Sequence, residues 1–299
     1  MKTKTVLQIL VLSAVWGISF LMIRVAGTVF PPLWVALMRS SLGALLLWGV
    51  LLLGGNKLPP RKALGWLALV ALFNNAIPFT LFALGEKTVP SNIAGVINAT
   101  TPIWTLLLSI AIFRVRMTGL MIGGVLLAFA GVVVVVMNQT VDAAQVPGAA
   151  LRGSIIIGLA ALGYAIATVI AKAKLKGLDP VGLATMQLSL AAGMVLPFAA
   201  LGERPAALAW GPVAAVSVLG FAGSGLAYLL YFKLLGEVSA TQVVAVTYLL
   251  PLWGLMWGAI AHEAVGLAAC VGVAITIVGL VILNWKPAPK VEVVQAVCE

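Results

Sequence analysis

Charged side chains are scarce in this chain. They make up 9% of the 299 residues, whereas 63% of the residues are apolar, and the mean hydropathy is +1.16. A soluble protein of this length needs more polar side chains than these to cover its surface. The composition therefore excludes a soluble fold and indicates that the lipid bilayer is the solvent of the chain.

The residues that most often carry catalysis or hold a metal are also few. The chain has two cysteines, Cys270 and Cys298, and one histidine, His262. We expect Cys270 to be buried in a membrane helix and Cys298 to lie in a cytoplasmic tail, so no disulfide or metal site follows. The sequence contains no Asp pair, Ser–Lys or Ser–His pair, His-Glu metal motif or nucleotide-phosphate loop in a suitable context. It predicts no catalytic residue, no metal and no cofactor, and it disfavours an intramembrane enzyme.

Acidic residues are missing from the middle of every apolar stretch. All eight are expected in loops, at helix ends or in the tail: Glu86, Asp142, Asp179, Glu203, Glu237, Glu263, Glu292 and Glu299. A proton antiporter for organic cations needs a carboxylate at membrane depth that proton and substrate share. The distribution disfavours such exchange and favours a neutral or zwitterionic substrate.

Ten apolar stretches are long enough to cross about 30 Å of hydrocarbon as helices. The predicted ranges are 6–26, 33–53, 64–84, 92–113, 119–137, 154–172, 181–201, 212–234, 241–261 and 266–285. Runs such as 132–136 are apolar on every face and do not alternate as barrel strands do. The sequence therefore predicts an all-α membrane protein.

The second half of the chain repeats the first at an offset of about 148 residues. The matching positions run along both halves: Trp16 with Tyr164, Arg24 with Lys172, Pro32 with Pro180, Arg39 with Gln187, Ser41 with Ser189, Gly85-Glu86 with Gly236-Glu237, Pro102 with Pro251, and Gly124 and Gly131 with Gly272 and Gly279. Ordered matches of this kind indicate duplication of one five-helix unit. We expect a first unit at 1–140, a loop at 141–153, a second unit at 154–285 and a cytoplasmic tail at 286–299.

The basic residues predict how the helices are oriented. With the N-terminus in the cytoplasm, 13 of the 18 Lys and Arg residues fall inside, and Arg24, Lys87, Arg152 and Arg204 fall outside, with Arg39 in a helix. This bias predicts cytoplasmic termini. Because each unit has an odd number of helices, the two units enter the bilayer from opposite sides, which makes the repeat inverted. The basic residues are dispersed and form no patch for nucleic acid.

Several of these residues resemble a known family. The Trp16-Gly17 start, Arg39 in the second helix, the Gly85-Glu86 turn and the positions of Pro102 and Pro251 resemble the drug/metabolite transporter superfamily. More narrowly, the two units resemble the EamA type, and within it a YddG-type amino-acid exporter. The resemblance implies a ten-helix carrier whose two inverted five-helix repeats surround a central cavity. The chain departs from the pattern at Arg114 and Arg116, where members often have Gly-Glu.

Helices interrupted by proline and carrying amides are the candidates for the transport path, because polar groups at membrane depth must face protein or a wet cavity. The predicted substrate-binding residues are Trp16, Asn75, Phe79, Asn98, Thr101, Tyr164, Tyr228, Tyr248 and Trp253, and the predicted hinge residues are Pro78, Pro102 and Pro251. Pro102 and Pro251 each free a carbonyl one turn earlier that could bind a ligand. The resemblance implies that Trp16, Tyr164 and Tyr228 add aromatic walls to the cavity.

Each of these features also has a structural interpretation. Proline in membrane helices often marks only a packing kink, and Asn and Thr often form hydrogen bonds between helices. For Trp253 the sequence supports packing and cavity lining equally. Gly119-x3-Gly123 and Gly254-x3-Gly258 predict close helix contacts within a monomer. Arg39 either attracts a substrate carboxylate or, in the interpretation that the sequence favours, bonds neighbouring carbonyls or reaches the outer surface from a peripheral helix.

The sequence therefore predicts a monomeric, multi-pass carrier in a bacterial inner (plasma) membrane. We expect it to export amino acids, chiefly aromatic and other apolar ones and also Thr or Met, or similar small metabolites, by alternating access between its two units. The alternative is a multidrug or other metabolite carrier of the same superfamily. A channel is less favoured, because the chain has no ring of charges and no repeated filter sequence.

Overall fold

The computed structural model describes residues 3–113, 118–139, 146–206, 208–237 and 240–283. Within these ranges the regular structure is helical and no strand occurs. Eight helical stretches are long and apolar enough to cross a membrane, and two shorter apolar stretches, Val246–Ile260 and Leu267–Leu283, follow them. This confirms the prediction of an all-α membrane protein.

The helices follow one another in two series. The first comprises α1 (Thr3–Ala26), α2 (Pro32–Gly54), η1 (Arg61–Ala63), α3 (Leu64–Ala71), η2 (Leu72–Ala76), α4 (Ile77–Gly85), α5 (Ser91–Asn98), α6 (Thr101–Phe113) and α7 (Gly119–Met137). The second comprises α8 (Ala149–Lys174), α9 (Pro180–Leu201), α10 (Trp210–Gly220), η3 (Phe221–Leu226), α11 (Ala227–Glu237), α12 (Ala240–Ile260) and α13 (Leu267–Leu283). The elements η1 to α4 form one continuous stretch, as do α10 to α11, and the π-helical segments η2 and η3 lie inside these two stretches.

Among the described residues, every predicted helical range coincides with helix to within a few residues at its ends, with two larger differences. Helix α8 begins at Ala149 and not at 154, because Gly148 adopts a φ of 79° that turns the chain directly into the helix. The predicted helix 92–113 is divided into α5 and α6 just before Pro102, which cannot continue the hydrogen-bond ladder of a helix. Arg114, Arg116, residue 140 of the predicted first unit, residues 141–145 of the predicted loop and the predicted tail 286–299 lie outside the described residues.

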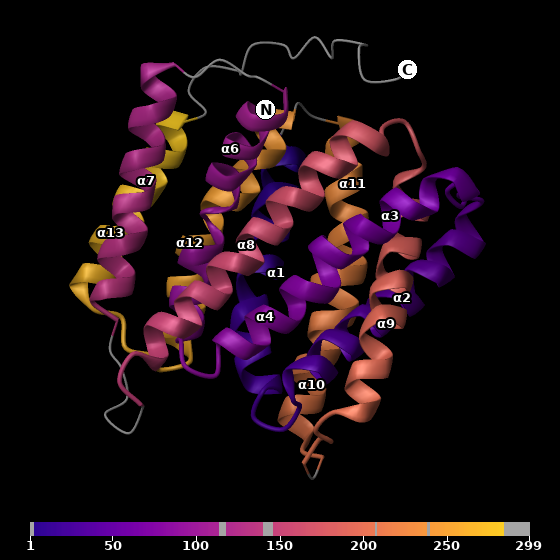
Figure 1. The fold of residues 1–299 in the computed structure, drawn as a ribbon, viewed down its shortest axis with the longest axis horizontal. Coiled ribbons are helices and arrows are strands. Elements are labelled where there is room, and N and C mark those ends of the chain that lie inside the picture. Colours follow the sequence, from indigo (N-terminus) through magenta and orange to yellow (C-terminus); the bar gives the residue numbers. More distant parts are fainter. Residues whose placement is uncertain (1–2, 114–117, 140–145, 207, 238–239, 284–299) are drawn as a thin grey trace.

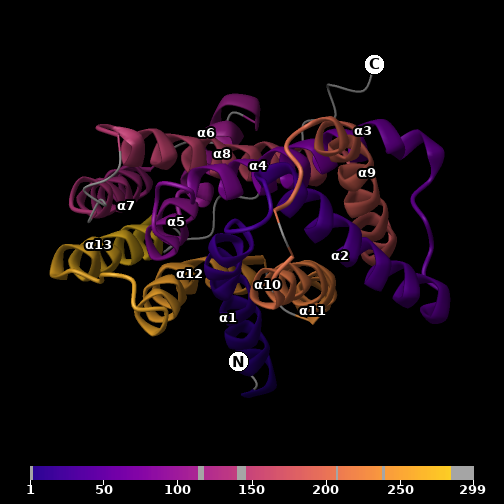
Figure 2. The same ribbon diagram turned by 90° about the horizontal axis from the view of Figure 1, so that it is seen from below.

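The bundle has two ends, which we name by α1. Helix α1 begins at the proximal end, at the top of Figure 1 near the label N, and finishes at the distal end. Helix α8 begins at the distal end and slants across the front of the bundle in Figure 1. Figure 2 shows α2 and α9 together on one side and α7 and α13 on the other, with α1, α4, α8, α10 and α12 between them. Both side pairs are packed helix against helix.

Glycines allow α7 and α13 to approach backbone to backbone. A Cβ atom on Gly131 would collide with Thr276 and with the carbonyl oxygen of Gly272. A Cβ atom on Gly279 would collide with the backbone of Ala128. Since apolar side chains gain little by leaving lipid for protein, close backbone packing of this kind is a main source of helix association in membranes.

The glycine motifs predicted from spacing behave differently from one another. Gly254 and Gly258 pack against Asn92 and its neighbours on α5, as a close contact within the monomer requires. Gly119 and Gly123 have no atom within 4 Å of their Cβ positions, so this pair makes no helix contact within the described chain. The predicted contact at Gly119-x3-Gly123 is therefore wrong, because these residues lie on the outer side of α7 and Gly124 and Gly131 face α13.

Substitution of Gly131 by Leu should separate α7 from α13. Overpacking of a tight contact typically costs about 1–3 kcal/mol, and a loss of this size lowers the Tm of a protein of this length by roughly 5 °C. Thermal unfolding of the purified protein in detergent, followed by intrinsic fluorescence, measures the change. Gly123→Leu on the same helix is the matched control and should leave the Tm unchanged; an equal loss in both variants would contradict this packing.

Candidate functional site

Polar side chains from five membrane-depth elements converge at the centre of the bundle. We call them the central cluster, and they are Arg39 from α2, Asn74 and Asn75 from η2, Gln187 from α9, Ser224 from η3 and Tyr228 from α11. Phe79 of α4 lies against this cluster. Arg39, Asn75, Gln187 and Ser224 are buried, and Asn74 and Tyr228 are half-buried.

The two π-helical segments supply three of these side chains. Each segment has a wider turn than an α-helix, and such single-turn bulges occur frequently at functional sites. In η2 the next amide, Ile77 N, donates to the carbonyl of Leu72, and Pro78 follows without a donor of its own. The local change of pitch directs Asn75 inward. Gly163 on α8 accommodates the bulge, since a Cβ there would lie 2.9 Å from the carbonyl oxygen of Phe73.

The phenol oxygen of Tyr228 is the acceptor around which the amides gather. Asn74 Nδ2 donates to it over 2.9 Å, Asn75 Nδ2 over 3.3 Å and Gln187 Nε2 over 3.4 Å. Gln187 Nε2 also donates to Asn75 Oδ1 over 2.5 Å. These bonds join helices from both halves of the chain at membrane depth, where no water would replace a missing partner.

Arg39 is a buried cation in this cluster, with an exposed fraction of 7%. Its Nε donates to Ser224 Oγ over 3.1 Å, and its guanidinium carbon lies 3.9 Å from the ring centre of Phe79. Among the described residues no carboxylate forms an ion pair with it. The interpretation of Arg39 as a peripheral residue that reaches the surface is therefore wrong; α2 carries it into the interior, beside Tyr164 and Tyr228.

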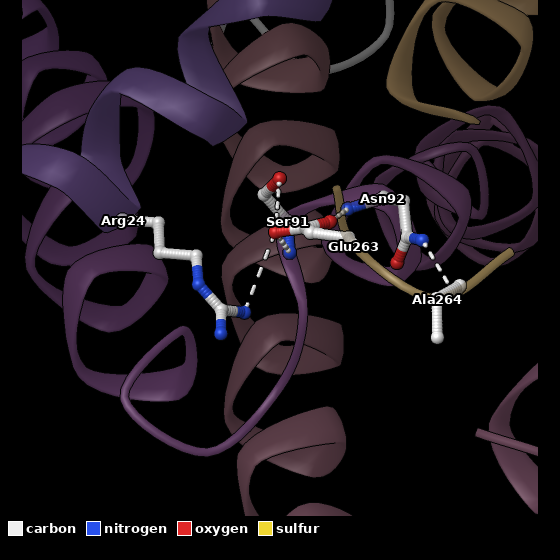
Figure 3. Close-up of polar contacts among 5 residues, drawn as sticks. All are labelled: Arg24, Ser91, Asn92, Glu263 and Ala264. Atoms are coloured by element: carbon white, nitrogen blue, oxygen red, sulfur yellow. Dashed lines mark hydrogen bonds and ion pairs between the residues drawn. The ribbon is translucent and has the colours of Figure 1, made fainter. Parts of the chain in front are cut away.

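A second group of polar residues lies at the distal end. We call Arg24, Ser91, Asn92 and Glu263 the distal cluster (Figure 3). Glu263 Oε1 accepts hydrogen bonds from the amide and hydroxyl of Ser91, at 3.1 and 2.8 Å, and Oε2 accepts the amide of Asn92 at 3.0 Å. Arg24 Nη1 lies 3.4 Å from Glu263 Oε1.

The position of Glu263 follows from local geometry. Ser91 and Asn92 begin α5, so their amides have no partner within the helix and favour a negative charge. His262 just before Glu263 has a φ of 58°, a left-handed conformation that is uncommon for residues other than glycine, and it turns the chain toward α5. The distal cluster thus joins α1, α5 and the connection between α12 and α13.

Glu86 lies near the distal end without such partners. It follows α4 directly, is 5% exposed, and neither carboxylate oxygen has a hydrogen-bond partner among the described residues. The sequence placed Glu86 correctly at a helix end but did not predict its burial. The apolar residues around it explain the burial: Phe82, Ala83, Val89 and Ile93 all belong to the distal hydrophobic core.

The structure brings several predicted site residues together. Asn75, Phe79 and Tyr228 meet at the central cluster. Tyr164 lies next to them, packed in the same hydrophobic cluster as Phe79 and Tyr228, with its ring 5.9 Å from that of Phe82. Pro78 is buried directly after η2.

Other predicted residues lie elsewhere along the helices. Trp16 contacts Tyr231, at 5.6 Å between ring centres, and Trp253 packs against Gly17 and donates to Ser13 Oγ over 2.8 Å. Asn98 ends α5, and its carbonyl accepts the hydroxyl of Thr101, so this carbonyl already has a partner. Tyr248 packs beside α7 and α13, Pro102 lies at the start of α6, and Pro251 lies inside α12, which continues through it.

Sequence reasoning missed several features of these regions. Gln187 and Ser224 were not predicted as site residues, Arg39 was placed at the periphery, and the burial of Glu86 was not predicted. The alignment of Arg39 with Gln187 was the available signal, because two polar residues at equal depth in related units meet near the axis that relates the units. Cys270 was expected to be buried, but it is exposed on the outer side of α13.

Comparison with known proteins gives a consistent result. The model of the EamA-like transporter family matches residues 3–137 and again residues 151–285. "Uncharacterized inner membrane transporter YedA" of Escherichia coli is 30% identical over 249 residues, covering 82% of this chain and 78% of its own. "Uncharacterized transporter YvbV" of Bacillus subtilis is 26% identical and covers 95% of this chain and 93% of its own. A solved structure titled "Crystal structure of protein" has a TM-score of 0.68 at 19% identity, covering 95% of this chain and 98% of its own, and so shares the fold.

Removal of the Tyr228 hydroxyl should destabilise the centre of the bundle. Tyr228→Phe removes an acceptor shared by three amide groups, and a buried donor left without a partner costs about 1–3 kcal/mol. A fall in Tm of the purified protein measures this loss. Tyr164→Phe is the control, because the Tyr164 hydroxyl forms no hydrogen bond within the described part of the chain and its ring contacts are unchanged. A larger fall in Tyr164→Phe would contradict the assignment.

Proposed function

The chain belongs to the EamA-like transporter family, a family of membrane transporters, and from this premise we propose that it exports amino acids by alternating access. The proposed substrates are aromatic and other apolar amino acids, with Thr, Met and similar small metabolites included. The substrate site is the central cluster together with Phe79 and Tyr164. The observation that carries the proposal is a buried Arg39 without a carboxylate partner.

The substrate carboxylate supplies the missing partner of Arg39. A guanidinium removed from water is costly, and a carboxylate offers it charge-assisted, bidentate hydrogen bonds. Phe79 and Tyr164 provide aromatic surface for an apolar side chain, and Asn75 Oδ1, which accepts one bond from Gln187, has a second lone pair for an ammonium. A zwitterion with an apolar side chain therefore meets complementary groups at each of its three parts.

The arrangement of the helices supports two inverted five-helix units, which we propose at 1–140 and 154–285. Helix α1 starts at the proximal end and α8, its counterpart, at the distal end (Figure 1). The glycine contacts are reciprocal in the way that a twofold axis requires: Gly124 meets Gly279, and their counterparts Gly272 and Gly131 meet each other. The units enclose the π-helical segments η2 and η3 at matching places. Exchange of two shapes between such units opens the site to either side.

We further propose that the proximal end faces the cytoplasm of a bacterium and that the carrier acts as a monomer in the inner membrane. Helix α8 runs from the distal to the proximal end (Figure 1), and its last turn carries Lys172 and Lys174, whereas its first turn carries Arg152 alone. Cytoplasmic loops carry an excess of Lys and Arg. The Escherichia coli relative is named an inner membrane transporter, which agrees with this location.

The remaining predicted residues have supporting roles in this proposal. Trp16, Trp253, Asn98, Thr101 and Tyr248 are proposed to bind substrate outside the central cluster, on α1, α5, α6 and α12. The proposed hinge positions are Pro78, which lies next to η2, Pro102 and Pro251. Of these, Pro78 and Pro102 stand at visible changes of helical geometry.

A multidrug carrier for organic cations is the second candidate, and buried Glu86 is the observation that favours it. A carboxylate without a hydrogen-bond partner is a site for a cation or a proton. Arg39 argues against a cation at the centre, because the guanidinium would repel it without an intervening acid. A zwitterionic or anionic substrate therefore remains the better match to the central cluster.

Substitution of Arg39 should slow transport. Proteoliposomes preloaded with unlabelled Phe should take up labelled Phe by counterflow, which a carrier shows and a channel does not. Arg39→Gln should slow this exchange about tenfold or more, since a hydrogen bond between charged groups contributes about 1.5–3 kcal/mol. Arg39→Lys should retain part of the activity through its charge.

The exposed Arg152, at the distal start of α8, provides the matched control. Arg152→Gln changes the net charge by the same amount and should exchange at the wild-type rate. If Phe, Met and Thr all fail to exchange while an organic cation moves with an imposed pH gradient, the second candidate is correct.

A further inference from the structure

We propose that Glu86 is a proton-binding site whose proton holds the distal end of the carrier closed. Opening of this end to water would release the proton, and closing it would take the proton up. The inference goes beyond amino-acid export by naming a coupled ion. It rests on the proposed function only in that the chain alternates between two shapes.

Two carboxylates near the distal end lie at opposite kinds of helix end. Glu263 faces the amino end of α5, where it accepts three hydrogen bonds and pairs with Arg24. Glu86 lies at the carboxyl end of α4, where the backbone carbonyls carry partial negative charge and disfavour an anion. The same chemical group is therefore stabilised as an anion at one position and destabilised at the other.

Burial strengthens the difference. Glu86 is 5% exposed and neither of its oxygens has a donor among the described residues. An ionised carboxylate in such a place costs many times more than a neutral carboxylic acid, so the group takes up a proton instead. Glu86 is the first residue beyond the span Arg61–Gly85, and burial raises the pKa of its carboxyl well above the usual range.

The charged and titratable groups around Glu86 come from every element that packs near it. Glu263, from the connection after α12, adds to the rise in its pKa, whereas Arg24 on α1 and Arg39 on α2 oppose the rise. Helix α8, which packs along α4, contributes Tyr164 and, at its exposed start, Arg152. Lys87, which follows Glu86, and His262, which precedes Glu263, are both exposed. Helices α5 and α10 carry no titratable residue.

The position of Glu86 connects its proton to the closure of the distal end. The residues around it pack into one hydrophobic core with residues of α1, α5, α8 and α10, among them Ile23, Ala26 and Leu219. Any separation of these helices admits water to Glu86. A hydrated carboxyl has an ordinary pKa, so the open form binds the proton more weakly than the closed form. By linkage, low pH favours the closed form and rising pH favours opening.

The experiment measures the opening of the distal end directly and uses no substrate. In the full chain with Cys270→Ser and Cys298→Ser, the substitution Ala26→Cys places a single thiol at a buried position of the distal core. The rate at which a maleimide alkylates this thiol is measured from about pH 6 to about pH 9, the range in which a buried Glu titrates. Each rate is divided by that of the same protein carrying Glu86→Gln, which cancels the ionisation of the thiol.

The normalised rate should rise with pH by about tenfold for each unit by which the pKa of Glu86 differs between the closed and open forms. His262→Asn removes the imidazole next to Glu263, and the rise should persist in it. A normalised rate that stays flat, or a rise that disappears in His262→Asn, would overturn the proposal.

A second measurement covers the case in which Glu86→Gln does not fold. The infrared spectrum of the wild-type protein at neutral pH should contain the carbonyl band of a protonated carboxylic acid, and Glu86→Asp should shift that band. Absence of the band, or a band that Glu86→Asp leaves in place, would show that Glu86 is ionised. Since neither readout involves an amino acid, a failure here leaves the Arg39 proposal standing, and a failure of counterflow leaves this one standing.

Discussion

The absence of water in the hydrocarbon region is the constraint on which the rest of this structure depends. Every polar side chain at membrane depth must find its partner within the protein. At the centre of the bundle the amides of Asn74, Asn75 and Gln187 share one acceptor, Tyr228, and Arg39 lies between Ser224 and an aromatic ring. In the described part of the chain Arg39 has no ion-pair partner, and the carboxylate of Glu86 has no hydrogen-bond partner.

Arg39 and Glu86 differ in whether they can lose their charge. Arg39 keeps its charge, because a guanidinium does not lose its proton in proteins, and in the proposed function the substrate supplies an anion for it. Glu86 can discard its charge by binding a proton and therefore requires no anion or cation to remain buried. Each charge also acts on the other, since Arg39 favours the ionised form of Glu86. A substrate carboxylate that neutralises Arg39 would remove this effect and favour the proton on Glu86.

The fold was largely predictable from the sequence, because hydrophobic length and the positions of glycine and proline determine helices in lipid. In the described part of the chain all ten apolar ranges are largely helical, and Asn75, Phe79 and Tyr228 lie together. The sequence did not predict which face of each helix packs against which neighbour. Gly123 and Gly124 are adjacent in the chain, yet only Gly124 faces α13. The same limit hid the inward position of Arg39. The burial of Glu86 was hidden because it depends on residues from four other helices.

The duplication accounts for the geometry of the site but not for its chemistry. Arg39 and Gln187 occupy related positions, and both enter the central cluster, one as a cation and one as a neutral donor. The segments η2 and η3 are likewise related, but η2 contributes two amides and η3 a hydroxyl between glycines. Related units must share a backbone shape in order to exchange conformations, whereas a substrate with a carboxylate at one end and an ammonium at the other requires unlike groups. In the proposed function the first half therefore carries the charge that binds the substrate, and the second half supplies Tyr228 and Gln187, which bond to the amides of η2.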